Sequence, residues 1–356
     1  MSHNTVFCFL REFMSEGSAA SRSKLALWVG AFAGFYRPGV EEVRRLDAVS
    51  KFLYSARSVI LVISAQAAII AGLLALAARR FDALAFVLVL SGFVSAHMIS
   101  NLSNDYFGYK RGHDTPDSPR MRYTVHPLAS GVLDSSTLLT GLAVISAIGL
   151  SILAFFIVER GWTAASFASA GIALLFLYDA APVPLKSIGL GEPAVFLVWG
   201  PLMIGGGYAM IAGEISPAAF WASIPYGLGV MSILVGKHID QMDFDRGKRI
   251  RTLPVLLGER TARALNVATV ALIYAAAAAL IVLGLLTPFA ALIVVALPRA
   301  WRAVKLMSRP RPPAAPAGYV GWPLWYHRAC LVHNRLFGWL YILGLAAGAA
   351  WPGVRL

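Results

Sequence analysis

Long apolar runs alternate with short polar breaks along most of the chain. A helix needs about 20 apolar residues to cross the hydrocarbon core of a bilayer, and runs of about that length recur here. We therefore predict about nine transmembrane helices, at 59–78, 84–104, 136–157, 162–178, 192–212, 217–238, 263–284, 286–298 and 333–351. The run at 286–298 is the shortest. The expected fold class is an all-α membrane protein.

The region before the first predicted span is polar and basic rather than apolar. We predict a cytoplasmic N-terminal extension at 1–57, followed by a transmembrane domain at 58–356. Within the extension, LALWVGAFAGFYRPGVEEVRRL reads as an apolar piece broken at Pro38 and then a charged helix, which fits an interfacial helix or a loosely ordered extension equally well. Because no short positive segment and no cleavage signature flank the first apolar run, we expect no signal peptide.

The composition supports a membrane protein and narrows its partners. Hydrophobic residues make up 58% of the 356 residues and charged residues only 14%. The formal net charge of +13 points to an anionic lipid or substrate, since the apolar background argues against nucleic acid. The two cysteines, Cys8 and Cys330, lie far apart, so neither a disulfide framework nor a zinc site is indicated.

The distribution of Lys and Arg orients the predicted helices. If the N-terminus is cytoplasmic, the outside loops hold little more than Arg79, Arg80, Arg160 and Arg355. Nearly all other basic residues fall in inside segments, namely the N-terminal stretch, 105–135, 179–191, 239–262 and 299–332. Because basic loops resist translocation, we predict a bacterial-type cytoplasmic membrane protein with its N-terminus and functional site on the cytoplasmic side.

Two acidic clusters follow the second and sixth predicted spans. The first is SNDYFGYKRGHDTPDSPR (103–120) and the second is GKHIDQMDFDRGKRIRTLPVLLGER (236–260). Carboxylates at the end of a membrane helix are costly unless they face a cavity, pair with a cation or bind a metal. Because both clusters are expected at the cytoplasmic end, they indicate one shared site.

Helical spacing predicts which acids point inward. Asn101 and Asp105 share one helical face at i, i+4, and Asp240 and Asp243 share another at i, i+3. Asp245 is rotated by about 140° from Asp240 and is expected beyond the helix end.

Asp114 comes nine residues after Asp105, on the opposite face of a continuous helix. It joins Asp105 only if the chain turns, and Gly108 and Gly112 permit that turn.

Few hard oxygen ligands beside basic residues suit Mg²⁺ that bridges to a phosphorylated substrate, and a diphosphate is the natural candidate. Basic residues able to neutralise it are Lys110, Arg111, Arg120, Arg122, Lys186, Lys237, Lys248, Arg249 and Arg251. Membrane topology alone also makes such loops basic, which is an even alternative for several of these residues taken singly.

Four stretches in order resemble the UbiA superfamily of intramembrane prenyltransferases, especially the branch that includes 1,4-dihydroxy-2-naphthoate prenyltransferases. They are NLSNDYFGYKRGHDTPD, HPLASG, YDAAPVPLKSIGLGEPAVFLVWGPLM and KHIDQMDFDRGKRIRTLPVLLGE, and the resemblance runs from about residue 95 to 345. It implies nine transmembrane helices around a central cavity, capped by loops on the cytoplasmic side.

The resemblance also implies a reaction. Mg²⁺ held by two aspartate-rich motifs would ionise an isoprenyl diphosphate, and an aromatic or quinone-precursor acceptor would attack the allylic cation. The expected cofactor is Mg²⁺, and the expected partners are the isoprenyl diphosphate, a lipophilic or aromatic acceptor and membrane lipid. Neither nucleic acid nor an obligate protein partner is expected.

Carried over position by position, the resemblance implies that the catalytic and metal-holding acids are Asp105, Asp114, Asp240, Asp243 and Asp245. It adds Asn104, Tyr178 and Lys186 as substrate-binding residues. Position and charge add Asn101, Lys110, Arg111, Lys237 and Arg251 to that set.

The first motif departs from the family at Gly108, where an aspartate is usual. Asp117 or His113 could substitute, or the site could be retuned for an unusual acceptor or for terpene cyclisation. A cation-coupled transporter is an alternative of another class. His126 could be a base or a structural turn residue, and Glu192 a helix cap or a catalytic group.

Overall fold

The computed structural model describes residues 24–33, 38–115, 118–319 and 321–351. All regular elements in this part of the chain are helices, which confirms the predicted fold class. Eight of the helices it describes are long and apolar enough to cross a membrane.

The long helices coincide with the predicted spans. Two are interrupted by π-helical segments: α8 continues into Phe176–Ala180, and Val198–Gly205 joins α9 to α10. The bounds are α5 Ser58–Ala77, α6 Ala83–Lys110, α7 Ser135–Arg160, α8 Trp162–Leu175, α9 Gly191–Leu197, α10 Gly206–Ala212, α11 Pro217–Asp240, α14 Glu259–Val282 and α16 Tyr326–Ala350.

The predicted span at 286–298 differs from the others. Pro288–Ala296 is a 3₁₀ helix of 9 residues, and α15 (Leu297–Met307) follows it directly. Arg299, Arg302 and Lys305 make α15 polar on one face, so this segment is not among the eight apolar helices.

Short helices occupy the polar stretches. The apolar piece before Pro38 is α2 (Lys24–Ala33), and the charged piece after it is α3 (Val40–Arg44), followed by α4 (Ala48–Ser55). Later short elements are the 3₁₀ turns Pro119–Arg122 and Leu185–Ser187, α12 Met242–Gly247 and α13 Leu253–Leu257. The break at Pro38 matches the sequence, and the interfacial position of this region stays a prediction.

The chain forms two compact units. One comprises residues up to Val62 together with His97–Ser146, and the other comprises Ile63–Ala96 together with the residues from Ala147 onward. The first unit contains the short N-terminal helices and the second half of α6. In this unit Phe52 of α4 packs where a side chain at Gly141 of α7 would otherwise lie.

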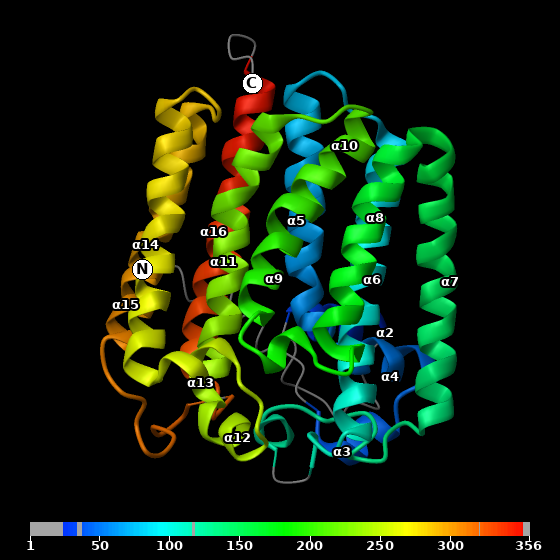
Figure 1. Cartoon of the computed structure of the whole chain (residues 1–356), viewed down its shortest axis with the longest axis vertical. Coiled ribbons are helices and arrows are strands. Elements are labelled where there is room, and N and C mark those ends of the chain that lie inside the picture. The colour runs from blue at the N-terminus through cyan, green and yellow to red at the C-terminus, as the bar shows by residue number, and fades with distance from the viewer. Residues whose placement is uncertain (1–23, 34–37, 116–117, 320, 352–356) are drawn as a thin grey trace. The chain divides into compact units, whose positions relative to one another are not determined.

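The second unit is built around α11. Figure 1 shows α11, α14 and α16 running side by side in this unit. Both α14 and α16 pack on α11. Gly227 of α11 lies so close to the π-helical segment that a Cβ there would be 3.0 Å from the Gly200 Cα. The buried Tyr226 hydroxyl donates to the Ile63 carbonyl at 2.7 Å, and Tyr341 donates to the Ala222 carbonyl at 2.8 Å. Satisfied hydroxyls on large buried rings stabilise the position of α11 within its unit.

Candidate active site

Asp105 lies inside α6, because that helix continues past the predicted end at 104 to Lys110. Its side chain is fully buried (0% exposed), and two guanidinium groups neutralise it. Arg120, on the 3₁₀ turn Pro119–Arg122, donates to both carboxylate oxygens, at 2.7 Å to Oδ2, and Arg57 donates to Oδ1. Two positive charges on one negative charge leave this buried triad cationic.

Arg57 reaches Asp105 from the turn that precedes α5. Its backbone φ is 60°, in the left-handed region that a residue with a Cβ rarely adopts. Asn101, one turn before Asp105, is also buried, and its amide donates to the Ala56 carbonyl beside Arg57 at 2.9 Å. The predicted shared face of Asn101 and Asp105 is therefore present, and Asn101 uses its amide group to hold the Arg57 turn.

Asp114 turns back onto the end of α6, as the glycines predicted. Gly112 has a φ of 67°, and the Asp114 amide donates to the Gly108 carbonyl at 3.2 Å. A Cβ at Gly108 would overlap the Asp114 Oδ2. The Asp114 carboxylate thus occupies the space that a side chain at 108 would fill, one helical turn from Asp105.

His126 holds Asp114 in place. Its Nδ1 accepts from the backbone amides of Leu128 and Ala129 at 3.2 and 3.1 Å, and its Nε2 lies 3.2 Å from the Asp114 carboxylate. Burial lowers the pKa of His126 and outweighs the opposite effect of Asp114. Because Nδ1 accepts two backbone amides and Nε2 faces Asp114 at 3.2 Å, both ring nitrogens are engaged in holding the loop, which favours the structural alternative.

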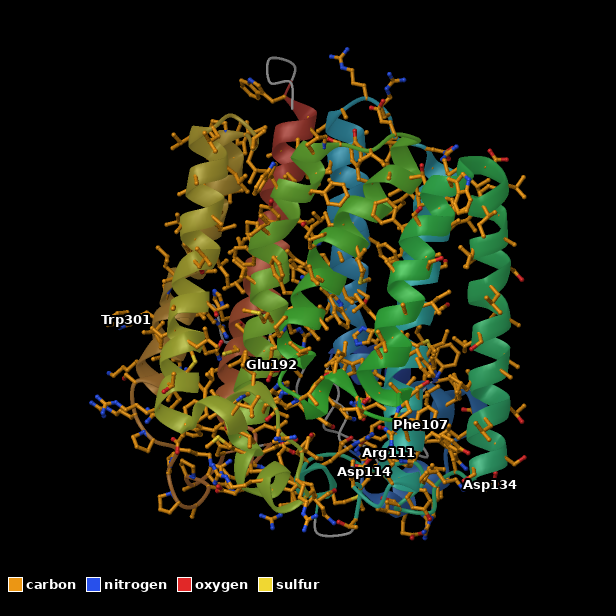
Figure 2. All side chains as sticks on the ribbon, viewed as in Figure 1. Phe107, Arg111, Asp114, Asp134, Glu192 and Trp301 are labelled. Atoms are coloured by element: carbon orange, nitrogen blue, oxygen red, sulfur yellow. The ribbon has the colours of Figure 1, made fainter. Side chains whose placement is uncertain are left out.

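The remaining predicted residues of the first cluster lie at its rim. Lys110 is exposed and stands over the Tyr106 ring at 5.7 Å, and Arg111 stands over the Phe107 ring at 5.5 Å. Figure 2 shows Phe107, Arg111 and Asp114 close together near the C-terminal end of α6. Asn104 is half-buried, and Asp117 lies outside the described residues.

Asp240 ends α11 and is bound by backbone groups. Its Oδ1 accepts from the Tyr326 amide at 3.1 Å and its Oδ2 from the His327 amide at 2.9 Å. These amides begin α16, so Asp240 acts as a cap on the positive end of that helix. Arg311 lies 3.9 Å from the carboxylate and donates to the Asp240 carbonyl at 2.7 Å.

The predicted inward face of Asp240 and Asp243 is wrong. The helix breaks at Gln241 and resumes as α12, so the regular i, i+3 relation is lost. The Asp243 side chain is 89% exposed and pairs with Arg246 at 3.3 Å. Asp245 is the buried acid instead, with 6% exposed.

Asp245 differs from the other buried acids of the described residues because it forms no ion pair with a basic side chain. Its Oδ2 has no hydrogen-bond partner among the described residues. Burial raises the pKa of Asp245, and the positive charges of His238, Lys237 and Lys186 oppose that rise. The predicted Lys186 and Lys237 thus act on this carboxylate.

Two further buried acid–base pairs accompany Asp245 in the second unit. Glu192 is fully buried at the start of α9 and lies 2.7 Å from the His238 Nδ1, and Lys186 pairs with Asp179. Tyr178 lies on the same π-helical segment as Asp179, and its ring is within reach of Gly191. Arg251 is exposed, although its amide donates to the Ser187 carbonyl at 3.2 Å.

A comparison with known families decides which protein family this is. Residues 66–327 match the model of the UbiA prenyltransferase family, which is well over half of the chain. The chain belongs to the UbiA prenyltransferase family. It is an integral membrane prenyltransferase, and the alternative of a cation-coupled transporter is set aside.

Relatives and solved structures agree with this family. The chain is 24% identical to the 1,4-dihydroxy-2-naphthoate octaprenyltransferase of Bacillus subtilis, over 75% of this chain and 82% of that protein. It is 28% identical to the Escherichia coli protein of the same name, over 62% and 72%. A UbiA homologue from Archaeoglobus fulgidus bound to GPP and Mg²⁺ has a similar fold, with a TM-score of 0.55 at 15% identity, over 83% of this chain and 99% of that one.

The described acids of this UbiA member form no complete metal-binding group by themselves. Among the described residues no three His, Cys, Asp or Glu side chains form a group that could hold a metal ion. Mg²⁺ is commonly held by one or two carboxylates plus substrate phosphates, so a complete protein cage is not required. The buried Oδ2 of Asp245, which has no hydrogen-bond partner among the residues the structure describes, fits such a ligand, and Asp105 fits once its guanidinium partners turn to another anion.

Sequence reasoning missed several residues that surround the two acidic clusters. Arg57 and His238 were not singled out, and Arg120 was only one of many basic residues. A signal for Asp179 was present, because it is an acid at the end of a predicted span, seven residues before Lys186. The prediction that both clusters form one site concerns the arrangement of the two units and stays a prediction.

Proposed function

We propose that the protein transfers an isoprenyl group from an isoprenyl diphosphate to an aromatic or quinone-precursor acceptor, releasing diphosphate, and that Mg²⁺ is required. The observation that carries this proposal is the buried triad of Asp105, Arg57 and Arg120. A magnesium diphosphate offers an anion to the arginines and a cation to the carboxylate. Both partners of the ion pairs can therefore be exchanged without leaving a buried charge alone.

The basic side chains would hold the leaving group. The guanidinium groups of Arg57 and Arg120 suit bidentate contacts to phosphate oxygens, and Lys186 and Lys237 supply point charges beside Asp245. As the allylic C–O bond breaks, its electron pair leaves with the diphosphate, where these charges stabilise it.

We assign metal binding first to Asp245, Asp105 and Asp114. Bound Mg²⁺ would neutralise charge on the diphosphate and make it a better leaving group. Asp240, whose oxygens accept backbone amides, would position the end of α11, and the exposed Asp243 would contribute least.

The acceptor would then form a carbon–carbon bond to the allylic carbon and lose a proton. The names of the Bacillus subtilis and Escherichia coli relatives support a naphthoate-type acceptor. The Asp114 carboxylate already fills the space at Gly108, so the missing motif aspartate gives no reason to favour cyclisation. This supports transfer over a terpene cyclase.

The test uses purified full-length protein with Mg²⁺ and a series of isoprenyl diphosphates. We expect a prenylated product only when 1,4-dihydroxy-2-naphthoate or a related phenolic acceptor is added, and no product after metal chelation. A hydrocarbon or terpene alcohol formed without any acceptor would instead identify a cyclase.

We also propose that the N-terminus and the most basic loops face the cytoplasm, on the evidence of the charge distribution. Single cysteines at Lys248 and at the exposed Arg79 test it by labelling in intact cells. A reagent that cannot cross the membrane should modify only position 79. Labelling at position 248 alone would show that the protein has the opposite orientation.

A further inference from the structure

One side chain of the connector between α15 and α16 reaches the end of α11. The connector has the proline-rich sequence SRPRPPAAPAGYVGWP (308–323). Its Arg311 donates from one guanidinium nitrogen to the Asp240 carbonyl at 2.7 Å and to the Pro323 carbonyl at 3.2 Å. The guanidinium also stands over the Trp322 ring at 5.1 Å. Arg311 therefore joins the last residue of α11 to the far end of the connector.

The Asp240 carbonyl lies where a donor is needed. The last carbonyls of a helix have no partner within it, and their partial negative charge favours a cation. Here α11 ends at Asp240, the helix breaks at Gln241, and α12 begins at Met242. Arg311 thus supplies a charged donor at the break.

The Asp240 carboxylate depends less on Arg311 than the carbonyl does. Its two oxygens accept the amides of Tyr326 and His327 at 3.1 and 2.9 Å. Arg311 lies 3.9 Å from the carboxylate, farther than from the carbonyl. Arg311 therefore acts as a cap on the backbone of α11 rather than as the counter-charge of Asp240.

The buried Asp245 lies one helical turn beyond this capped end. Its amide donates to the Gln241 carbonyl at 2.9 Å, at the start of α12. Because α12 has only 6 residues, it is not stable by itself, and its place depends on the elements that hold its ends. A shift of the α11 end would therefore displace the Asp245 carboxylate.

The connector is itself held in place at Arg311. Pro310 and Pro312 stand on either side of this residue and restrict its backbone. The Tyr326 hydroxyl donates to the Arg309 carbonyl at 2.8 Å. The Arg311 side chain thus extends from an ordered support.

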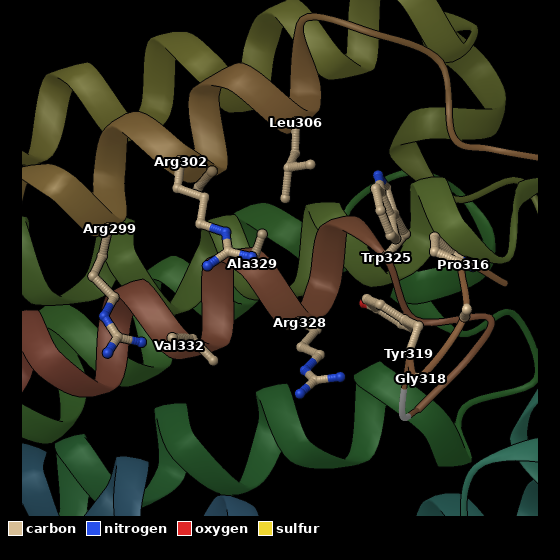
Figure 3. A pocket seen from close by; sticks show the side chains of 12 residues that line it. Arg299, Arg302, Leu306, Pro316, Gly318, Tyr319, Trp325, Arg328, Ala329 and Val332 are labelled. Carbon is tan, nitrogen blue, oxygen red and sulfur yellow. The ribbon is translucent and has the colours of Figure 1, made fainter. Parts of the chain in front are cut away.

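Aromatic rings fix the far end of the connector. Figure 3 shows the Tyr319 and Trp325 rings beside one another where the connector reaches α16, and their centroids are 5.0 Å apart. Trp322 packs edge-on against both, at 6.3 and 6.4 Å. The Tyr319 hydroxyl donates to the Leu324 carbonyl at 2.7 Å. The ring that contacts Arg311 therefore belongs to a fixed aromatic group.

We propose that Arg311 is a positioning residue for the reaction, because by holding the end of α11 it sets the place of the Asp245 carboxylate. The inference rests on the proposed function, in which Asp245 binds the Mg²⁺ of the substrate. A displacement of about 1 Å at a reacting group lowers the rate by up to about 100-fold, so a loosened α12 lowers activity without unfolding the protein.

A first measurement follows the position of α12 without any reaction. Spin labels are attached at Asp243→Cys on α12 and at Lys305→Cys on α15, which are both exposed positions. The purified full chain carries Cys8→Ser, and Cys330 is buried away from the label. Double electron–electron resonance then gives the distribution of distances between the two labels.

Three variants are compared in this labelled chain. We expect Arg311→Gln to shift or broaden the distance distribution, because the α11 end loses its charged donor. Arg309→Gln is the matched control, since it removes the same charge from an exposed residue of the same connector, and it should keep the native distribution. Arg311→Lys keeps the charge and one donor to the carbonyl, so its distribution should lie between the two. It also replaces Arg311→Gln if that variant fails to fold.

A second measurement connects this position to the reaction. Diphosphate release is followed well below the melting temperature, with an isoprenyl diphosphate and 1,4-dihydroxy-2-naphthoate. We expect Arg311→Gln to lower kcat about tenfold and to raise the half-saturating Mg²⁺ concentration about tenfold, with KM for the isoprenyl diphosphate within about twofold. Loss of folded protein alone would lower kcat and leave the Mg²⁺ dependence unchanged. Arg309→Gln should match the native chain in all three quantities.

The outcomes separate this inference from the proposed function. A native distance distribution together with a native Mg²⁺ dependence in Arg311→Gln would overturn the positioning role and leave the proposed function in place. Equal changes in Arg309→Gln and Arg311→Gln would also overturn it, since they would follow from the lost charge alone. A native chain that releases no diphosphate would overturn the proposed function, and the label distances would then still decide whether Arg311 holds α12.

Discussion

The two acidic clusters hold their central carboxylates in different ways. Asp105 is neutralised by the side chains of Arg57 and Arg120, whereas Asp240 accepts the backbone amides of Tyr326 and His327. Side chains can rotate toward a new anion, but amides at the start of a helix cannot leave their place. The difference separates a carboxylate with exchangeable partners from one whose partners are part of the fold.

The second acids of the two clusters, Asp114 and Asp245, also differ in how their carboxylates are held. Asp114 lies 3.2 Å from the Nε2 of His126, whose Nδ1 accepts two backbone amides. Asp245 is buried, one of its oxygens has no hydrogen-bond partner within the described part of the chain, and burial raises its pKa. A buried carboxylate in that condition gains most from a cation that arrives with the substrate.

Asp105→Asn should have the largest effect, because it removes the negative charge that pairs with the buried Arg120 and the half-buried Arg57 guanidinium groups. We expect the free energy of unfolding to fall by about 3–5 kcal/mol and diphosphate release to fall at least about 100-fold. Denaturation of the purified protein and a diphosphate-release assay measure the two losses. The double variant with Arg57→Gln should recover part of the stability, and strictly additive losses would contradict the ion-pair account.

Asp245→Asn should separate activity from stability. We expect diphosphate release to fall about 100-fold, as for loss of one group that stabilises charge in the transition state. Stability should be unchanged or higher, because a poorly compensated buried charge is removed. Thermal melting and the release assay, run in parallel, test this.

Asp243→Asn is the matched control for Asp245→Asn, since Asp243 is an exposed acid on the same short helix. It should leave both measurements within about twofold of the native values, as expected for a surface ion pair. If Asp243→Asn caused the greater loss of release, the swap of roles between these two acids would be refuted.

Asp240→Ala should chiefly lower the free energy of unfolding, because Asp240 supports the fold rather than the reaction. It leaves the amides of Tyr326 and His327 without an acceptor at the start of α16, and we expect a loss of about 1–3 kcal/mol in unfolding free energy. Asp240→Asn, which keeps one acceptor oxygen, should lose about half as much. Equal stability of all three proteins would show that the cap contributes nothing.

The sequence predicted the membrane spans well, but it predicted only some of the side-chain positions and partners at the two acidic clusters. The reasons are physical. An apolar run of about 20 residues has few alternatives to a membrane helix, so its place follows from composition. The side-chain directions past Asp240 depended on a break at Gln241, where neither Gly nor Pro gives a signal. Arg57 pairs with Asp105 across 48 residues, and no local spacing rule connects positions so far apart.

Gly108→Ala should reduce diphosphate release less than the substitutions of Asp105 and Asp245, and it concerns the first cluster alone. A Cβ at 108 would overlap the Asp114 Oδ2, so the carboxylate must move away from the His126 Nε2. Alanine stabilises a helix interior by about 1 kcal/mol relative to glycine, which offsets the lost contact. We therefore expect little change in the melting temperature and a roughly tenfold fall in diphosphate release.

Gly92→Ala, in the same helix, is the control for Gly108→Ala. Its Cβ would meet the Ile152 side chain at an ordinary 3.5 Å, so the helix gains the same propensity without displacing an acid. Release should stay at the native rate in this variant. If Gly108→Ala also kept the native rate, the position of Asp114 would be irrelevant to catalysis, and the first cluster would act through Asp105 and its arginines alone.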